Sequence, residues 1–348
     1  MRAGIYRGIR NLVIEDVPAP VAGQGDIVLD VAACGICGSD LHSYTEGVWI
    51  ADGMGMGHEF SGHVSEIGPG VCGLSLGDAI TVNPFVPCGA CAQCRAGRMN
   101  LCADASASGA TAFADQIVIH DVDVGRRVFK IPSGVSLEEA CLLEPLSVAV
   151  RAVELSRAAP GQTVVVLGLG AIGQCAVQVL RARGVTDVIA VDRSRMRLER
   201  AAASGASTTI DGSGADLAAA LVALTAPTVS PFQEASSVDV VIECAGAAPL
   251  LPSVLRATRA GGTVVLVGLF SRAVDIDLNV VVQKELLVHG SFAYTEDDVR
   301  QAFGLIASGA VDMASLITQR HPLDDIQGAF QAQLDAENSI KVVVGPGS

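Results

Sequence analysis

The stretch that decides the fold reads VVVLGLGAIG and occupies residues 164–173. Its apolar residues run directly into glycines spaced as G-x-G-x-x-G, and a helical pattern follows. Gly168 permits a tight turn, Gly170 lets the backbone approach a pyrophosphate at the helix N-terminus, and Gly173 lets helix and strand pack closely. A strand, such a turn and a helix in this order predict a dinucleotide site. Its phosphate-binding residues are expected to be Gly168, Gly170, Ala171, Ile172 and Gly173.

A carboxylate follows the next expected strand. Asp192 comes directly after the apolar run 188–191. A carboxylate at this place can accept both ribose hydroxyls of NAD and would repel a 2′-phosphate, so NAD is preferred to NADP. The adjacent Arg193 weakens that preference, and a surface aspartate at a strand end is the alternative interpretation. Arg197, on the helix that follows, completes the expected cofactor-binding set.

After residue 163, expected strands alternate with helical segments. In the earlier part of the chain, short β-like runs alternate with glycine-proline turns. The alternation predicts a doubly wound parallel sheet covered by helices on both faces. The earlier pattern predicts a compact, mainly antiparallel β domain. An apolar strand at 340–344 could rejoin that first domain, and 225–237 is the most loop-like stretch. The strands expected in the parallel sheet are 163–167, 188–191, 238–242, 263–267 and 286–290.

Length and charge exclude several classes of function. At 348 residues the chain is long enough for about two domains. Its formal net charge is −14 and it contains no basic run, so nucleic acid and anionic membrane surfaces are poor partners. Residues 1–14 lack the apolar stretch of a signal peptide, and a cytoplasmic protein with reduced thiols is expected. The cysteines expected in apolar core positions are Cys72, Cys141, Cys175 and Cys244.

Four other cysteines share one loop, residues 84–104, with the spacing C-x2-C-x2-C-x7-C. Four thiolates can close a tetrahedral zinc site that has no open position, which is typical of a structural metal. Such a metal can contribute about 10 kcal/mol or more to ordering a loop that has no core. A nucleic-acid-binding zinc module is disfavoured, because two separated C-x2-C pairs are absent and the chain is acidic. The expected ligands are Cys88, Cys91, Cys94 and Cys102.

Further metal-binding residue types are dispersed along the chain. ICGSDLH at 36–42 is followed by GHEF at 57–60 and LEPLSV at 143–148. Together with the four-cysteine loop and GLGAIG, this ordered set resembles the zinc-containing medium-chain dehydrogenases over essentially the whole chain. The sorbitol, butanediol and threonine dehydrogenase branch is the most similar. The resemblance implies an α/β protein with a GroES-like β catalytic domain (1–151 and 292–348) around an inserted Rossmann NAD-binding domain (152–291).

The resemblance also implies a second, catalytic zinc. Cys37 and His58 match the ligands of that zinc in the family. Glu59 and Glu144 match carboxylates that bind it directly or through water, and the sequence does not rank them. A capping or surface acid is the alternative for Glu144. Asp40 resembles the carboxylate that orients the ligand histidine.

The implied reaction is hydride transfer between NAD and a secondary alcohol, diol or polyol, or the corresponding ketone. Ser39 and His42 match the family's proton relay, with a turn serine and a surface histidine as the alternatives. Other readings are an NADPH-dependent zinc carbonyl reductase and, less favoured, a non-catalytic zinc- and nucleotide-binding regulatory protein. The resemblance further implies a homodimer or homotetramer, and the only other partner expected is a small-molecule substrate.

The substrate is less constrained. Polyol-specific relatives carry an Arg-Tyr pair after the last Rossmann strand, whereas residues 290–294 here read GSFAY, with Tyr294 but no arginine. This departure favours a small secondary alcohol, a diol or a cyclic polyol over a long or charged polyol. Tyr44 and Trp49 are candidate pocket walls, with core or lid packing as the alternative.

Overall fold

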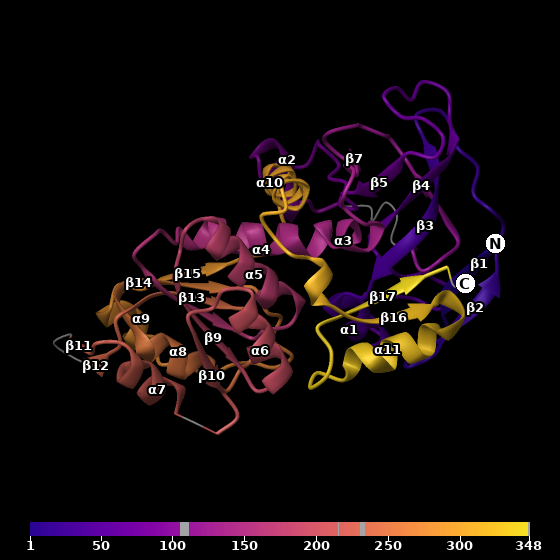
Figure 1. Ribbon diagram of the computed structural model, residues 1–348. Coiled ribbons are helices and arrows are strands. Elements are labelled where there is room, and N and C mark those ends of the chain that lie inside the picture. Colours follow the sequence, from indigo (N-terminus) through magenta and orange to yellow (C-terminus); the bar gives the residue numbers. More distant parts are fainter. Residues whose placement is uncertain (105–110, 215, 230–233, 347–348) are drawn as a thin grey trace. The chain divides into compact units, whose positions relative to one another are not determined.

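The computed structural model describes residues 1–104, 111–214, 216–229 and 234–346. Contacts between residues group the chain into two compact units (Figure 1). Unit 1 comprises Met1–Ser147 and Tyr294–Ser348, and unit 2 comprises Val148–Ala293. Within the described ranges, no helix is both long enough and apolar enough to cross a bilayer.

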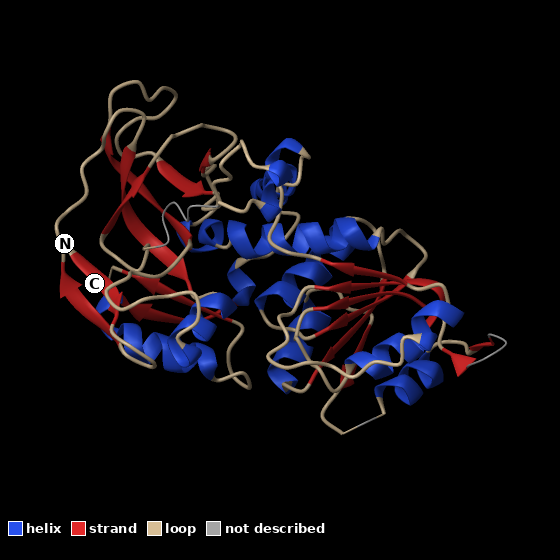
Figure 2. Ribbon diagram, turned by 180° about the vertical axis from the view of Figure 1, so that it is seen from behind, coloured by secondary structure: helices blue, strands red, loops and turns tan. Residues whose placement is uncertain are grey.

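Unit 2 is built on a six-stranded sheet whose strands all run parallel. The order β10-β9-β8-β13-β14-β15 is that of a doubly wound dinucleotide-binding fold. Helices cover both faces of the sheet (Figure 2), so the central strands β8 and β13 are mostly apolar and mostly buried. The strands are β8 (Thr163–Leu167), β9 (Asp187–Asp192), β10 (Thr208–Asp211), β13 (Val238–Glu243), β14 (Thr258–Leu266) and β15 (Leu287–Gly290).

The prediction of an α/β fold with a parallel sheet is confirmed, with one strand added. The sequence pattern did not reveal β10, because this short edge strand, TTID, offers a single buried apolar side chain, Ile210. Within the loop-like stretch 225–237, two-residue strands β11 (Thr228–Val229) and β12 (Glu234–Ala235) pair with each other. The helices of this unit are α5 (Ala171–Ala182), α6 (Arg195–Ala203), α7 (Leu217–Leu224), α8 (Leu251–Ala257) and α9 (Asn279–Gln283).

Unit 1 is mainly β-structure. A seven-stranded sheet has the order β16-β17-β3-β4-β5-β7, with β6 also paired to β3, and β1 (Arg2–Tyr6) and β2 (Leu12–Asp16) form a separate hairpin. The C-terminal strand β17 runs antiparallel beside β3, so the two separate chain segments of unit 1 build one sheet. The strands are β3 (Ile27–Gly35), β4 (Glu59–Ile67), β5 (Ala79–Val82), β6 (Gln116–Ile119), β7 (Val128–Lys130), β16 (Ile317–Pro322) and β17 (Lys341–Gly345).

Most helices that begin in unit 1 are short, and the longer α4 (Leu143–Ser156) continues from unit 1 into unit 2 at Val148. Ser136 caps α3 (Leu137–Cys141), since its hydroxyl accepts from the Glu139 amide and the Glu139 side chain accepts from the Ser136 amide. A new helix, α4, then starts. Pro145 is tolerated in its first turn because the backbone N–H groups of a first turn have no acceptor within the helix, so the N–H that proline lacks is not needed. The remaining helices are α1 (Gly38–Glu46), α2 (Ala92–Arg95), α10 (Glu296–Ala307) and α11 (Ile326–Leu334), with 3-10 turns at Met99–Leu101, Ala314–Leu316 and Leu323–Asp325.

Candidate active site

The turn from β3 into α1 brings Cys37 and Asp40 together. Cys37 is the N-cap of α1, and its amide donates to Asp40 Oδ2 at 2.9 Å. The other oxygen, Oδ1, lies 3.6 Å from His58 Nδ1. Burial raises the pKa of Asp40, while the same burial acts to lower that of His58. The charges of Asp40 and Cys37 outweigh this and hold the pKa of His58 well above its usual value. Asp40 therefore lies where it can orient the imidazole through Nδ1.

Three of the expected zinc-binding side chains meet in one place. Ligand-type atoms of Cys37, His58 and Glu59 all lie within 4.8 Å of one another. Ligands that bind one tetrahedral zinc ion at about 2.0–2.3 Å are separated from each other by roughly 3.3–3.8 Å. A thiol, an imidazole and a carboxylate are also the donor types that zinc prefers, so the residues present fit the metal.

Glu59 is held by a partner that sequence reasoning missed. The carboxylate is 1% exposed and accepts from Lys341 Nζ at 2.8 Å on Oε1 and 2.7 Å on Oε2. The ammonium group, at the start of β17, also donates to the Ile36 carbonyl at 2.8 Å. Burial acts to lower the pKa of Lys341, but the Glu59 charge raises it overall. The available signal was a lysine in an otherwise apolar terminal strand.

Glu144 lies in the first turn of α4, near His58 and Glu59 but outside the compact group found among the described residues. Burial raises the pKa of Glu144 to about 7; the His58 charge opposes this shift and the Glu59 charge adds to it. The buried Tyr294 hydroxyl shares a hydrogen bond with Glu144, and burial together with this carboxylate holds the pKa of Tyr294 well above its usual value. Tyr294 thus faces a candidate ligand, a contact that the sequence did not predict.

The expected relay residues both lie in α1. Ser39 is half-buried, and His42 lies one turn before Glu46, with Nδ1 2.9 Å from the Glu46 carboxylate. The Trp49 ring meets His42 edge-on, with 6.1 Å between ring centroids, and Trp49 is 69% exposed. Tyr44 is instead a core residue. It is 1% exposed and its hydroxyl donates to Gln327 at 2.6 Å, so the packing alternative applies to it.

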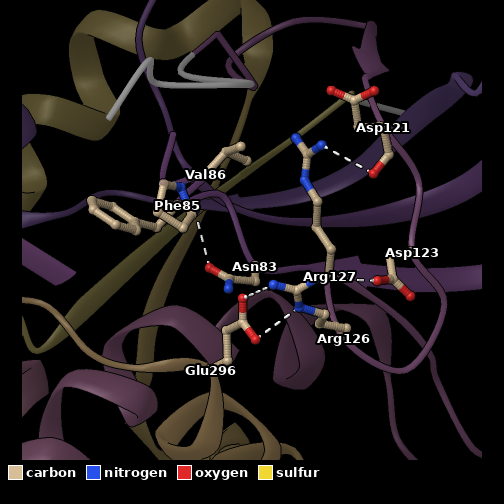
Figure 3. A pocket seen from close by; sticks show the side chains of 9 residues that line it. Asn83, Phe85, Val86, Asp121, Asp123, Arg126, Arg127 and Glu296 are labelled. Carbon is tan, nitrogen blue, oxygen red and sulfur yellow. Dashed lines mark hydrogen bonds and ion pairs between the residues drawn. The ribbon is translucent and has the colours of Figure 1, made fainter. Parts of the chain in front are cut away.

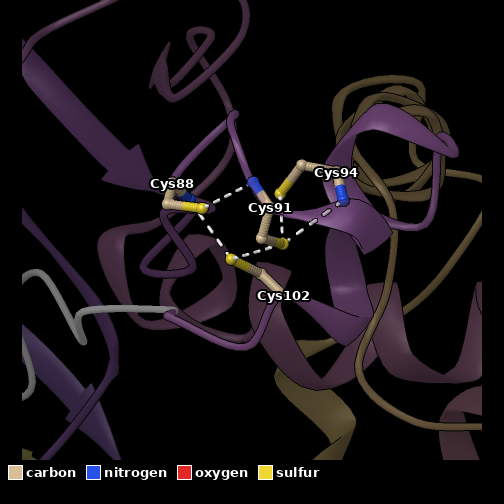
Figure 4. Close-up of side chains that lie close together, drawn as sticks. All are labelled: Cys88, Cys91, Cys94 and Cys102. Carbon is tan, nitrogen blue, oxygen red and sulfur yellow. Dashed lines mark hydrogen bonds between the residues drawn. The ribbon is translucent and has the colours of Figure 1, made fainter.

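The four loop cysteines converge (Figure 4). Their sulfur atoms all lie within 4.8 Å, with Cys91 Sγ 3.6 Å from that of Cys94 and 3.8 Å from that of Cys102. A tetrahedron of sulfurs at about 2.3 Å from zinc has edges of roughly 3.8 Å, so the set fits the metal. Backbone N–H donors, first that of Cys94, lower the pKa of Cys91 to about 6, whereas burial raises that of Cys94 to about 12. Cys72 is exposed, and its expected core position is wrong because it lies in an exposed loop between β4 and β5.

In unit 2 the glycine turn has the geometry that its residues predict. Gly168 has φ +87°, and a Cβ atom there would lie 2.5 Å from the Ala245 Cβ. A Cβ atom at Gly173 would lie 1.9 Å from the Gly168 carbonyl oxygen, and the same addition at Gly170 would meet only Arg197 Nη1, 4.0 Å away. Gly170 is the N-cap of α5, so open backbone faces the helix N-terminus where a phosphate can bind.

Asp192 does more than the sequence indicated. Its Oδ2 accepts from the Leu169 amide at 2.6 Å, and its Oδ1 accepts from the amides of Arg193 and Ser194 at 2.8 and 2.9 Å. Arg197 Nη1 lies 3.9 Å from Oδ2. The carboxylate therefore braces the glycine turn. Oδ1 already accepts two amides, whereas Oδ2 accepts one and retains acceptor capacity for a ribose hydroxyl.

A separate cavity of about 190 Å³ in unit 1 contains none of the expected site residues (Figure 3). Arg126 and Glu296 close one side of it through two hydrogen bonds of 2.7 and 2.8 Å. Arg127, 8% exposed, reaches the Asp121 carbonyl at 3.5 Å. The lining carries carboxylates as well as guanidinium groups and has no metal-ligand cluster.

Two family descriptions match the chain. Residues 23–133 match the alcohol dehydrogenase GroES-like domain, and residues 171–308 match the zinc-binding dehydrogenase family. Sorbitol dehydrogenase of Bacillus subtilis is 34% identical over 99% of this chain and 97% of its own length. The chain belongs to the zinc-binding dehydrogenase family. The resemblance, the GroES-like and Rossmann fold, and the class of zinc alcohol dehydrogenase-type oxidoreductase are thereby confirmed.

Solved structures agree with this family. The structure of 2R,3R-butanediol dehydrogenase from Bacillus subtilis matches with a TM-score of 0.87, 29% identity and 99% of each chain covered. A zinc-binding dehydrogenase from Sinorhizobium meliloti 1021, solved with NADP bound, matches with a TM-score of 0.87, 33% identity and 99% coverage of each chain.

The Lys341–Glu59 pair should be essential for stability. Replacing Lys341 with Met leaves a buried carboxylate without its cation, and we expect unfolding to become easier by about 3–5 kcal/mol. Lys130→Met breaks an ion pair with Asp78 whose lysine is 46% exposed, and should change stability by about 1 kcal/mol or less. Chemical denaturation of both variants measures the difference. Equal effects would show that burial does not strengthen the Lys341 contact.

Proposed function

We propose that the protein is an NAD-linked, zinc-dependent dehydrogenase that interconverts a secondary alcohol, diol or small polyol with its ketone. One observation carries this: Cys37, His58 and Glu59 converge at a distance that suits one metal ion, in a chain of the zinc-binding dehydrogenase family. Three ligands leave a fourth position for substrate. Unit 1 would then act as the catalytic domain and unit 2 as the NAD-binding domain.

Separate residues of the chain are proposed to bind the metal and to orient its ligands. When bound, the zinc ion supplies a Lewis acid that acidifies the substrate hydroxyl, and NAD supplies the hydride acceptor. Cys37, the N-cap of α1, and His58, directly before β4, would hold the metal, and Asp40 would orient the imidazole. Glu59 and Glu144 are two carboxylates that can serve as the third ligand, and each has a hydrogen-bond partner that limits its movement.

Two residues of α1 are proposed to carry the proton released from the substrate. Ser39 lies two residues after Cys37, and His42 lies one turn further along the same helix. His42 is half-buried and hydrogen-bonded to the exposed Glu46, which supports a path for the proton from the substrate hydroxyl to solvent. Cys88, Cys91, Cys94 and Cys102 would hold a second, structural zinc.

NAD is the proposed cofactor because Asp192 places a negative charge where NADP carries its 2′-phosphate. Gly168, Gly170, Ala171, Ile172, Gly173 and Arg197 complete the proposed binding set. The names of the sorbitol and butanediol dehydrogenases support a substrate with neighbouring hydroxyl groups. Tyr294 already bonds to Glu144, and no arginine precedes it, so a small substrate is favoured over a long polyol.

We also propose a cytoplasmic homo-oligomer, either a dimer or a tetramer. None of the ten cysteines forms a disulfide, which suits a reducing compartment. Strand β15 is an edge of the parallel sheet, and its Leu287 and Val288 are 51% and 42% exposed. An open apolar edge is a template for pairing, and a second copy can supply the same edge in antiparallel orientation about a two-fold axis.

The cofactor and substrate are tested by steady-state kinetics. We expect NAD reduction with secondary alcohols and vicinal diols, and a kcat/KM at least about tenfold higher with NAD than with NADP. Asp192→Ala should lower this ratio, because it removes the negative charge that repels a 2′-phosphate. A wild-type preference for NADP would favour the carbonyl reductase instead, and absence of turnover across the panel would favour a regulatory protein.

Metal analysis separates the two zinc sites. The wild type should bind two zinc ions per chain. Cys37→Ser should lose one ion and the activity while keeping the melting temperature, whereas Cys91→Ser should lose one ion and melt at a lower temperature. Cys72→Ser, at an exposed cysteine outside both clusters, is the matched control and should keep both ions. A fully loaded wild type with one ion would contradict the two-site assignment.

Sedimentation tests the oligomer. Val288→Lys places a charge on the exposed edge of β15 and should yield monomers. Val21→Lys, at a position 75% exposed in unit 1, should leave the assembly unchanged. An unchanged assembly in the Val288 variant would mean that the copies, if they associate, use another surface.

A further inference from the structure

A buried carboxylate ends the strand at which the order of the parallel sheet reverses. Glu243 is the last residue of β13, which lies next to β8. Chain connections leave these two strands toward opposite edges of the sheet, and ligands of such folds bind at the carboxyl ends of the strands at this point. Glu243 is nevertheless 0% exposed, so it does not itself face a ligand.

The carboxylate is surrounded by backbone donors. Oε1 accepts from the amides of Ala245 and Ala247, and Oε2 accepts from that of Gly246, each at 3.1 Å. The amide of Gly268, after β14, donates instead to the main-chain carbonyl of Glu243, at 3.0 Å. Burial raises the pKa of Glu243 and these donors oppose the shift. Successive amides that point at one anion form a nest of the kind that binds phosphate elsewhere, and here the anion is part of the chain.

The two turns that Glu243 joins are packed without spare room. A Cβ atom at Gly268 would lie 2.1 Å from the Gly246 amide nitrogen, and one at Gly246 would lie 2.2 Å from the Leu269 carbonyl oxygen. Ala245 in turn contacts Gly168 of the glycine turn. The position of Glu243 therefore sets the backbone next to the first glycine of the phosphate site.

We infer that Glu243 is a positioning residue for the nicotinamide half of the dinucleotide. A doubly wound sheet consists of two mononucleotide-binding halves. The half with β8, the glycine turn and Asp192 takes the adenosine side. The turn after β13 is its counterpart in the other half, where the internal carboxylate of Glu243 occupies the amide nest. That turn is thus shaped before the cofactor arrives, and it presents its outer backbone to the nicotinamide ribose. The inference rests on the proposed NAD-linked function.

Binding measurements with two probes test this role. Glu243→Gln keeps the shape but places an NH2 group among N–H donors, and we expect the Kd for NADH to rise about tenfold or more. The Kd for AMP, which needs only the adenosine half, should change by less than about twofold. Gly268→Ala forces the two turns apart without altering the charge and should give the same pattern. A general loss of folding would instead weaken both probes.

Lys284→Met is the matched control. Lys284 is 1% exposed in the same unit, and its ammonium group donates to the carbonyls of Leu255, Arg256 and Thr258 at the opposite, amino-terminal edge of the sheet. This variant should lower the melting temperature and leave both affinities unchanged. Unchanged NADH affinity in the Glu243 and Gly268 variants, or equal weakening of AMP and NADH, would overturn the inference. A wild type that binds neither NADH nor NAD would contradict the proposed function instead.

Discussion

The ion pair between Lys341 and Glu59 is the constraint on which the arrangement of unit 1 depends. Both groups are almost fully buried, and each is costly to remove from water unless the other is present. The pair fixes the start of β17 against the start of β4, next to His58. A third contact, to the Ile36 carbonyl, ties the residue before Cys37 into the same network. The C-terminal strand thus helps to hold the metal-binding side chains in place.

Carboxylates recur in this protein as braces for irregular backbone. Asp40 accepts from the Cys37 amide at the start of α1. Asp192 accepts from one amide of the glycine turn and from two amides that follow β9. Glu243 accepts from three amides after β13. Each lies at the end of a strand or the beginning of a helix, where amides lack partners within the element. Such anions stabilise the turns that carry ligands, and this explains why the functional backbone is ordered without regular secondary structure.

Local sequence patterns predicted the helices and strands more accurately than they predicted which residues contact one another. The strand β8 and the turn that follows were predicted at the observed residues. This was possible because the preferences of β-branched residues for strands and of glycines for turns depend only on nearby positions. The cysteine loop was equally predictable, since its four ligands are close in sequence. The edge strand β10 was missed because an edge needs few apolar side chains, and Tyr44 was ambiguous because an aromatic residue serves a pocket or a core equally well.

The sequence by itself determined the glycine turn, the cysteine cluster and the alternation of strands and helices, because each depends on neighbouring residues. It also contained the dispersed motifs that place the chain in its family. Only the tertiary structure decided that Lys341 neutralises Glu59, that Tyr294 bonds to Glu144 and that Glu243 fills a nest of amides. In each of these contacts a buried polar side chain meets a partner that the tertiary fold places beside it. A charge removed from water needs a nearby group of opposite charge or a hydrogen-bond partner. The tertiary fold determines which residue supplies it, and the local sequence pattern does not.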